Sequence, residues 1–495
     1  MSDKFMDGLK AETNRKVTEN GEIALKSTLN ANLDFFSLAG ACRRNRKLAL
    51  DKFISAYAED PETALRALFY TRNIRGGLGE REVFKTILRY MAVNHPKDIM
   101  ANFTNIARFG RYDDFYAMEG TPLEDEAFAY LREQFITDVA AVGSRKEGQT
   151  VTISLLGKWL KTMNSHNKET RRLALKTAEQ FGLTERQYRK MVSMLRKAIK
   201  IVERNMSANE WDKIKYEAVP SYAMKKHSAA FMKHDEDRFK NYINRVKEGS
   251  VKINASTLYP YDLIHELMYC RGCDRKTKIP VIEEQWKALP NYVEGSNKFL
   301  IMADVSGSML GRPLETAISL AIYFAEKNEG PYANKFLTFS QKPCLINIDG
   351  STLEDKMHQV SGAEWGMNTD LAAAFETILQ VAVNNKLKQK DLPESLVVIT
   401  DMEFDECVLD GSNFHDKMVK RFDSKGYKLP KVVFWNVDAR QATFHATATT
   451  PGVQFISGSS PSAFKSLIEG KDFDAIDLML ETLYNPMYDC VVLGE

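Results

Sequence analysis

Several features that mark special classes of protein are missing from this chain of 495 residues. Six cysteines are too few for a disulfide framework at this length, which indicates a reducing compartment. No apolar run approaches the roughly 20 residues that a membrane-spanning helix needs. The N-terminal stretch 1–26 is polar and mixed in charge, unlike a secretory signal. The sequence therefore predicts a cytoplasmic protein, without membrane attachment and monomeric.

Motifs of common catalytic sites are also missing. There is no Walker phosphate loop, no His-Glu-x-x-His zinc motif and no Gly-x-Ser-x-Gly nucleophile turn. Cys270 and Cys273 form a suggestive pair, but a structural zinc site needs two more ligands, and His265 is the nearest candidate. We therefore expect neither a zinc site nor an enzyme.

A strong net charge is missing too, but the charges are unevenly distributed. Residues 1–295 contain 50 Lys and Arg against 39 Asp and Glu, whereas residues 296–495 contain 18 against 27. A basic first part suggests a polyanionic partner, and an acidic second part suits cation binding.

The most informative stretch that is present is an apolar run, 299–303, followed by Asp304, Ser306 and Ser308. A continuous apolar run of this length predicts a parallel strand covered on both faces. The stretch 313–326 has apolar residues at helical spacing, with proline in its first turn. Open α/β sheets bind ligands at such strand ends, so we expect a site here.

Two later segments complete the predicted site. Thr369 precedes an alanine-rich helix at 371–383, and Asp401 ends a second apolar strand at 396–400. An all-oxygen set with few charges suits a hard cation, so the sequence predicts Mg²⁺, or Mn²⁺, with some water ligands. The predicted metal ligands are Asp304, Ser306, Ser308, Thr369 and Asp401. The alternative, an ordinary turn with later capping residues, is less favoured because all parts occur in order and in the right context.

This pattern, Asp-x-Ser-x-Ser with a distant Thr and a strand-end Asp, resembles the metal-ion-dependent adhesion site (MIDAS) of von Willebrand factor A domains. The resemblance implies that the serines and the threonine ligate the metal directly, and that the aspartates bind it directly or through water. A metal-dependent nuclease would gather more carboxylates. Further strands are expected at 335–339, 344–348, 432–437 and 453–457, and a helix at 415–422. Their alternation predicts a parallel, doubly wound α/β sheet.

The first part of the chain shows almost only helical patterns. Helices are predicted at 64–70, 80–93, 124–142, 153–163, 169–181 and 185–205. Successive amphipathic helices with short turns suggest an all-α, HEAT-like solenoid.

A helical-repeat body followed by an A domain is the layout of TROVE-module proteins such as the Ro autoantigen, which bind noncoding RNA. Three segments, at 74–81, 109–114 and 219–224, resemble more closely a domain-of-unknown-function family with this layout. The resemblance implies noncoding or misfolded RNA as partner, and a ring with a central hole if the helical arc is as curved as in TROVE proteins. The predicted domains are a polar segment (1–28), the helical body (29–292), the A-like domain (296–470) and a tail that docks on the body (471–495).

The candidate RNA contacts are basic residues in three regions. The glycine-rich loop with Arg72, Arg75 and Arg81 suits phosphate, or is only a turn between helices. Around Arg111, Tyr112 could stack a base, or the following aspartates cap the next helix, which we favour. The densest basic region contributes Lys168, Arg171, Arg172, Arg189, Arg196, Lys225 and Lys226. An ordinary solvated face remains the alternative for it.

Two functions are therefore expected from different classes. The first is a ribonucleoprotein scaffold, in which the basic helical surface binds RNA and the magnesium-binding A-like domain closes the repeat. The second is a metal-dependent protein interaction module with no RNA role, in which the cation recruits an acidic residue of a protein partner.

Overall fold

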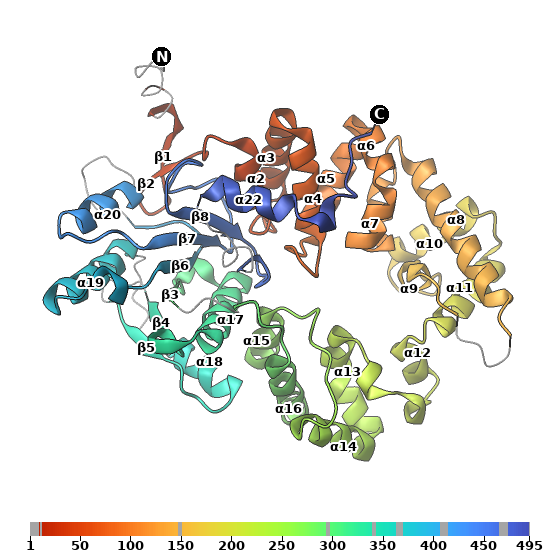
Figure 1. The fold of residues 1–495 in the computed structure, drawn as a ribbon. Coiled ribbons are helices and arrows are strands. Elements are labelled where there is room, and N and C mark those ends of the chain that lie inside the picture. Colours follow the sequence, from red (N-terminus) through yellow and green to blue (C-terminus); the bar gives the residue numbers. More distant parts are fainter. Residues whose placement is uncertain are drawn as a thin grey trace. The chain divides into compact units, whose positions relative to one another are not determined.

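The structure is a computed structural model that describes residues 9, 12–146, 151–293, 298–338, 343–362, 370–405, 414–464 and 474–494. The chain forms two compact units: unit 1 comprises 1–83 and 255–489, and unit 2 comprises 84–254 and 490–495. Most of the described residues are helical, and unit 1 also contains a six-stranded sheet (Figure 1). Within the described part of the chain, no helix is long and apolar enough to span a bilayer.

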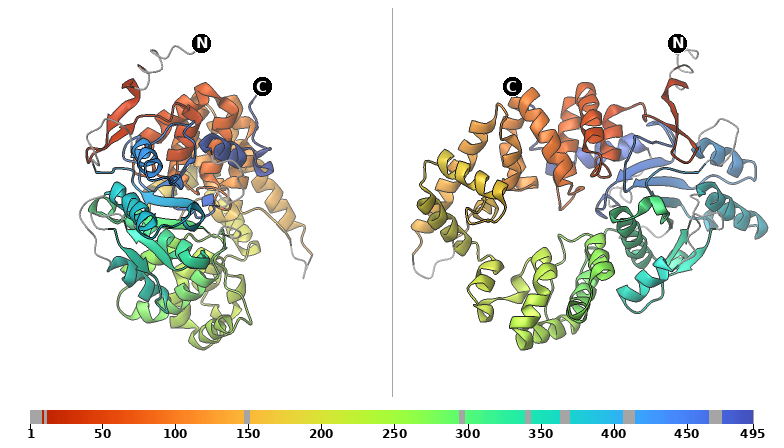
Figure 2. Two further views of the ribbon diagram at one scale, coloured as in Figure 1. Left: turned by 60° about the vertical axis from the view of Figure 1, so that its left-hand side comes forward. Right: turned by 180° about the vertical axis from the view of Figure 1, so that it is seen from behind.

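The sheet of unit 1 has the order β5-β4-β3-β6-β7-β8 and can be followed from two further sides in Figure 2. Its strands are β3 Phe299–Ala303, β4 Lys335–Thr338, β5 Leu345–Asn347, β6 Ser395–Thr400, β7 Lys431–Asn436 and β8 Val453–Ser457. After β3, the next strands β4 and β5 are added on one side of it. After β6, the strands β7 and β8 are added on the opposite side of the sheet. The order therefore reverses between β3 and β6, where open α/β sheets bind ligands.

The prediction of alternating strands and helices is confirmed, but the all-parallel prediction is wrong at one edge. Strand β5 runs antiparallel to β4, so the sheet is mixed. Six residues separate these two strands, and a parallel pair would need a crossover of a dozen or more. All residues of the central strand β3 are buried, as expected for a continuous apolar run covered on both faces, and so are all residues of β8, although β8 lies at the edge of the sheet.

Unit 1 contains helices from both of its sequence segments, 1–83 and 255–489. They are α2 Ala31–Leu38, α3 Arg46–Glu59, α4 Pro61–Arg72, α15 Pro260–Tyr269, α16 Cys273–Lys287, α17 Arg312–Lys327, α18 Leu353–Ser361, α19 Leu371–Asn384, α20 Phe414–Asp423 and α22 Ala475–Leu483. Leu263 and Ile264 of α15 share one apolar cluster with Ile301 of β3. The compact units divide at 83/84 and 254/255, so α15 and α16 lie in unit 1 together with the sheet; residues 294–297, near the predicted domain boundary, lie outside the described residues.

The N-terminal segment contains two short strands that the sequence did not predict. Strands β1 (Arg15–Val17) and β2 (Ile23–Leu25) pair antiparallel. The Leu25 amide donates to the Phe444 carbonyl at 2.8 Å, and the Phe444 amide donates back at 3.1 Å. Three-residue strands carry too little alternation to be read from sequence, so contacts with distant residues specify them.

Unit 2 is built from short helices around aromatic side chains. Its elements are most of α5 Arg81–Asn94, then α6 Pro96–Ala101, α7 Phe103–Phe109, η1 Tyr112–Met118, α8 Glu124–Gly143, α9 Leu156–Trp159, α10 Lys168–Gln180, α11 Glu185–Ala198, α12 Val202–Ser207, α13 Ser221–His234 and α14 Glu236–Lys247. The C-terminal residues also contact this unit, because the side-chain amides of Asn102 and Asn105 donate to the carbonyls of Val492 and Cys490.

Three segments differ between the prediction and the structure. The helix predicted at 185–205 is split into α11 and α12, because Lys200 adopts the left-handed conformation (φ 57°) that ends helices. The helix predicted at 153–163 shortens to the single turn of α9. The segment before Thr369, for which no helix was predicted, contains α18, whose N-terminus the Thr352 and Asp355 side chains cap.

Candidate functional site

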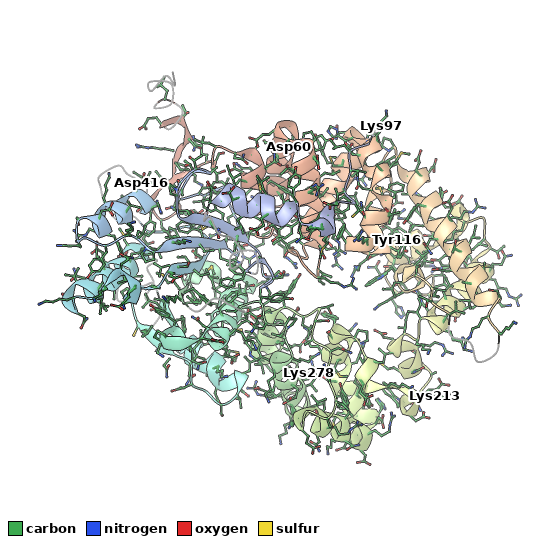
Figure 3. All side chains as sticks on the ribbon, viewed as in Figure 1. Asp60, Lys97, Tyr116, Lys213, Lys278 and Asp416 are labelled. Carbon is green, nitrogen blue, oxygen red and sulfur yellow. The ribbon has the colours of Figure 1, made fainter. Side chains whose placement is uncertain are left out.

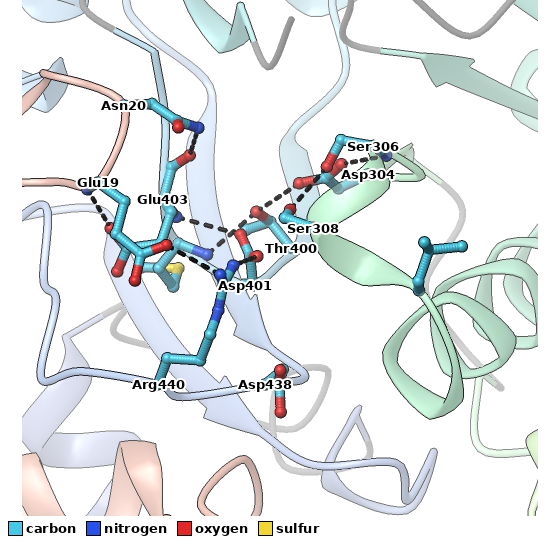
Figure 4. Close-up of polar contacts among 12 residues, drawn as sticks. Glu19, Asn20, Asp304, Ser306, Ser308, Thr400, Asp401, Glu403, Asp438 and Arg440 are labelled. Carbon is cyan, nitrogen blue, oxygen red and sulfur yellow. Dashed lines mark hydrogen bonds and ion pairs between the residues drawn. The ribbon is translucent and has the colours of Figure 1, made fainter. Parts of the chain in front are cut away.

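Two buried carboxylates meet where the strand order of the sheet reverses. Asp304 follows β3 and Asp401 follows β6, and Ala303, which precedes Asp304, pairs in register with Ile399, two residues before Asp401. The Asp304 amide donates to the Ile399 carbonyl at 2.8 Å. Both side chains are only 2% exposed, and they leave the same edge of the sheet (Figure 4). This confirms the predicted strand-end placement of both residues.

Asp304 accepts hydrogen bonds but has no cationic partner among the described residues. One oxygen accepts from the Ser306 amide at 2.9 Å, and the other accepts from the Thr400 hydroxyl at 3.1 Å. Burial, and then the nearby negative charge of Asp401, raise the pKa of Asp304 to about 7. A carboxylate held in this way lacks a positive counter-charge, and a divalent cation would supply one.

The two serines of the motif lie beside Asp304. A short turn, η4 (Gly307–Met309), brings the Ser308 hydroxyl to 2.9 Å from the Ser306 hydroxyl. Both oxygens are neutral ligands of the kind that Mg²⁺ accepts. Thr369 lies outside the described residues, so the structure brings together four of the five predicted ligands.

Asp401 is held by an arginine that the sequence analysis missed. Arg440 forms an ion pair with one Asp401 oxygen, and the other oxygen accepts from the Glu403 amide at 3.2 Å. Arg440 also contacts Glu19 at 2.8 Å, so the N-terminal segment takes part in this network (Figure 4). Arg440 lies four residues after the end of β7, at the sheet edge that also carries the carboxylates. Inspecting the residues after every predicted strand would have revealed it.

The described ligand residues contain too few carboxylates to bind a hard cation alone, so hydroxyl and water oxygens would have to complete its coordination. Among the described residues, no group of three or more His, Cys, Asp or Glu side chains could hold a metal. Asp304 and the hydroxyls of Ser306 and Ser308 lie together instead, the charge of Asp401 acts on Asp304, and Arg440 already offsets part of the Asp401 charge. The arrangement is therefore suited to a modestly charged Mg²⁺ or Mn²⁺ site rather than to a carboxylate-rich one.

The glycine-rich loop between α4 and α5 favours the turn interpretation over a phosphate cradle. The amides of Leu78, Gly79 and Glu80 donate to carbonyls of residues 70–73, at 2.8 to 3.1 Å. Amides used in this way cannot bind phosphate. Arg72 is only 4% exposed, which does not fit the predicted contact with RNA. Arg75 is exposed, and Arg81 is exposed and pairs with Glu82 at 3.1 Å.

The preferred interpretation of the next segment, a helix cap, is confirmed. The Asp114 carboxylate accepts from the Arg111 amide at 3.0 Å at the start of η1. The Arg111 guanidinium pairs with Asp113 at 2.7 Å and lies over the Trp159 ring, 3.9 Å from its centroid. Arg111 is therefore occupied by protein contacts.

The remaining predicted contacts, all in unit 2, differ in how available they are. Arg172 is tied to Glu119 at 2.6 Å and to Glu169 at 2.5 Å, and its guanidinium lowers the pKa of Glu119 to about 2. Lys225 is buried, with its ammonium over the Tyr222 ring. Besides Arg172, the exposed ones are Lys168, Arg171, Arg189 and Lys226, and Arg196 is partly buried.

A pocket in unit 2 contains basic residues that were not among the predicted contacts. It lies beside α9, α11 and α12, with a volume of about 560 Å³. Arg189 and Arg196 line it, as predicted contacts, together with Lys158, Lys161 and Arg204. Lys158 and Lys161 could have been found from the run Lys-Trp-Leu-Lys at 158–161, in which an aromatic residue is interleaved with basic ones.

Comparisons with known proteins identify families without assigned activities. Residues 18–115 and 126–298 match the family described as a domain of unknown function, DUF2828, and residues 298–484 match another such family, DUF7788. The uncharacterized protein L728 of Acanthamoeba polyphaga mimivirus is 29% identical, over 96% of this chain and 89% of that protein. The crystal structure of the Deinococcus radiodurans RO (RSR) protein is similar over 91% of this chain and 92% of that chain. Its sequence identity of 12% and TM-score of 0.35 are too low to assign a shared fold.

Proposed function

This chain belongs to the DUF2828 family, whose description assigns no activity, and from its residues we propose that unit 2 binds RNA while unit 1 holds a divalent cation. The RNA proposal depends on one observation. The stretch 156–207 contains 13 Lys and Arg but only four Glu and no Asp. Unit 2 as a whole contains 31 basic and 22 acidic residues, so this stretch accounts for its entire excess of nine positive charges.

A surface of this kind binds nucleic acid by neutralising phosphates and releasing counterions. Lys168 and Arg171 are exposed in this stretch, and no acidic partner contacts them among the described residues. The resemblance of the layout to TROVE proteins directs the proposal to noncoding RNA rather than to another polyanion. No catalytic step is part of the proposal.

The RNA proposal predicts a charge-specific loss of affinity. Replacing Lys168, Arg171 and Lys226 together with glutamine should weaken binding of a single-stranded RNA roughly tenfold or more at 0.1 M salt. The slope of log affinity against log salt should fall by about two, because each phosphate contact contributes about 0.7. Fluorescence anisotropy of the full chain over a salt series measures both quantities.

The matched control replaces three exposed lysines of unit 1, Lys388, Lys390 and Lys425, with glutamine, which changes the net charge equally. It should leave the affinity nearly unchanged. Equal losses in the two triple variants would show non-specific attraction and contradict the proposal, as would the absence of RNA binding by the unsubstituted chain.

For unit 1 we propose that Mg²⁺ or Mn²⁺ binds at Asp304, Ser306, Ser308 and Asp401, with Thr369 as a fifth ligand. The buried Asp304 without a cationic partner supports this most directly. The reversal of strand order at this edge agrees with the resemblance to a von Willebrand factor A domain, which we propose as the fold type. When bound, such a cation would offer an open coordination position to an oxygen ligand.

The ion pair of Arg440 predicts a competition with the cation. Replacing Arg440 with glutamine removes a positive charge beside Asp401, so cation binding should tighten by about tenfold, or about 1.4 kcal/mol. Calorimetric titration with Mn²⁺ measures the change. Arg421→Gln, which removes an exposed guanidinium of α20 that is paired with Glu376 of α19, should bind the cation as the unsubstituted chain does. Unchanged or weaker binding in Arg440→Gln would mean that the arginine supports the site instead.

A second candidate function, cation-dependent recruitment of a protein partner, is favoured by one observation. Leu310, two residues after Ser308, is 67% exposed, although large apolar side chains are usually covered. An apolar residue beside a metal site suits a partner that presents a carboxylate next to an apolar side chain. If the ultraviolet absorbance ratio of the purified full chain shows no co-purified nucleic acid, and the chain also has no affinity for RNA, this function is favoured over the first.

A further inference from the structure

The pocket beside α9, α11 and α12 has the size of a small-ligand site. Its volume is about 560 Å³, within the range of roughly 300 to 1,000 Å³ that such sites have. Its charged lining consists of Lys158, Lys161, Arg189, Arg196, Arg204 and Glu203. Five positive charges against one negative charge make it suited to an anion.

Two of the five cations make no contact with an acidic side chain in the described part of the chain. Arg189 and Arg204 are exposed and have no ion pair or hydrogen bond with the residues that the structure describes. The one acid, Glu203, lies 3.4 Å from the His227 ring nitrogen, so it already has a partner outside the pocket. An unneutralised cluster of cations favours binding of an anionic ligand.

Arg196 strengthens this argument because it is partly buried and also lacks a carboxylate partner among the described residues. Its guanidinium donates to the carbonyls of Gly157 at 2.9 Å and Leu160 at 2.8 Å, and to the Thr162 hydroxyl. These contacts fix its position at the end of α9 but leave its charge uncompensated. An arginine fixed in this way is preorganised to bind an oxyanion.

The pocket also has an aromatic wall. Trp159 and Tyr188 line it, together with the apolar side chain of Val192. The Arg111 guanidinium covers one face of the Trp159 ring, and the Tyr188 hydroxyl donates to the Lys161 carbonyl at 2.9 Å. The Lys161 ammonium lies 4.9 Å from the ring centroid of Tyr116, which Figure 3 labels. Tyr188 is only 1% exposed and supports the wall from behind, so the partly exposed Trp159 is the ring available to a flat base beside the fixed cations.

We propose that this pocket binds one nucleotide through its phosphate monoester, either as a free nucleotide or at the end of an RNA strand. A phosphate monoester carries about −1.5 to −2 charges at neutral pH, whereas each phosphodiester of an RNA chain carries one. Clustered arginines therefore prefer the monoester. The pocket is too small for duplex RNA, so the bound group is a terminal one. Binding of an RNA end in this pocket rests on the proposed function, whereas binding of a free nucleotide does not.

The test compares one oligoribonucleotide in three forms: with a 5′ phosphate, with a 3′ phosphate, and with hydroxyls at both ends. With the full chain, one phosphorylated form should bind about tenfold more tightly than the hydroxyl form. The double variant Arg189→Gln, Arg204→Gln should remove this preference. Both side chains are exposed, and circular dichroism checks that the variant is folded.

The matched control is Lys190→Gln, which removes an exposed charge from the same helix but outside the pocket. It should keep the full preference for the phosphorylated end. A preference that survives in the double variant would place the recognition elsewhere and overturn the assignment of this pocket.

A fourth arm uses nucleoside monophosphates alone, titrated by calorimetry. If all three oligonucleotides bind equally and no monophosphate binds, the pocket assignment is overturned while RNA binding stands. If no oligonucleotide binds but a monophosphate binds and the double variant abolishes this, the pocket assignment stands and the RNA proposal fails.

Discussion

An Asp304→Ala variant is expected to bind Mg²⁺ or Mn²⁺ at least about a hundredfold more weakly than the unsubstituted chain. Even the loss of a residue that only supports a metal ligand typically costs 10- to 100-fold. Asp304 is one of the two carboxylates among the predicted ligands, and the other is already paired with Arg440. Calorimetry measures the affinity, and thermal unfolding gives a second readout, because bound Mg²⁺ should raise the melting temperature of the unsubstituted chain only.

The control for this prediction is Asp51→Ala, which removes an exposed carboxylate from α3. Its cation binding should match that of the unsubstituted chain. If Asp304→Ala retained full cation affinity, the carboxylate pair would have only a structural role, and the proposed metal site would have to be abandoned.

A Gly77→Ala variant is expected to lose about 3 kcal/mol or more of stability, because overpacking against a rigid backbone is costly. A β-carbon at this position would lie 2.1 Å from the Tyr70 carbonyl oxygen and 3.0 Å from that of Asn73. Both atoms belong to backbone at the end of α4, so neither can move aside easily. The melting temperature should fall by several degrees or more.

Gly143→Ala provides the comparison, since a β-carbon there would meet no atom within 4 Å. At the end of α8, this change should be neutral or slightly stabilising, by less than about 1 kcal/mol. Equal melting temperatures for Gly77→Ala and the unsubstituted chain would show that the loop can move, and would reopen the phosphate interpretation that its hydrogen bonds now disfavour.

The sheet was predictable because its strands are continuous apolar runs that end in polar residues. This pattern located β3, β6, β7 and β8 to within a residue or two, and it placed Asp304 and Asp401 at one edge. The antiparallel direction of β5 could have been predicted only from the short length of the connection between β4 and β5. Long amphipathic helices such as α8 and α10 were equally clear, because their apolar positions repeat at helical spacing.

Features that depend on distant contacts were not predictable in the same way. The break between α11 and α12 needs the left-handed conformation of Lys200, and nothing in a lysine suggests it. The ion pair between Arg440 and Asp401 joins residues 39 positions apart, across two strands. Arg72 is basic in the sequence but buried in the fold, so composition alone overestimates the available positive surface.

The division of the chain into units also has a consequence for its synthesis. The backbone bonds of Leu25 join it to Phe444, about 420 residues later. At roughly 5 to 20 residues per second, a ribosome takes about 20 to 80 seconds to add that length. The helices α2 to α4, whose apolar side chains are buried in finished unit 1, therefore emerge long before the sheet strands that follow residue 298. Unit 1 therefore cannot complete its fold until the strands of the sheet have been synthesised, and the apolar faces of its early helices wait for them.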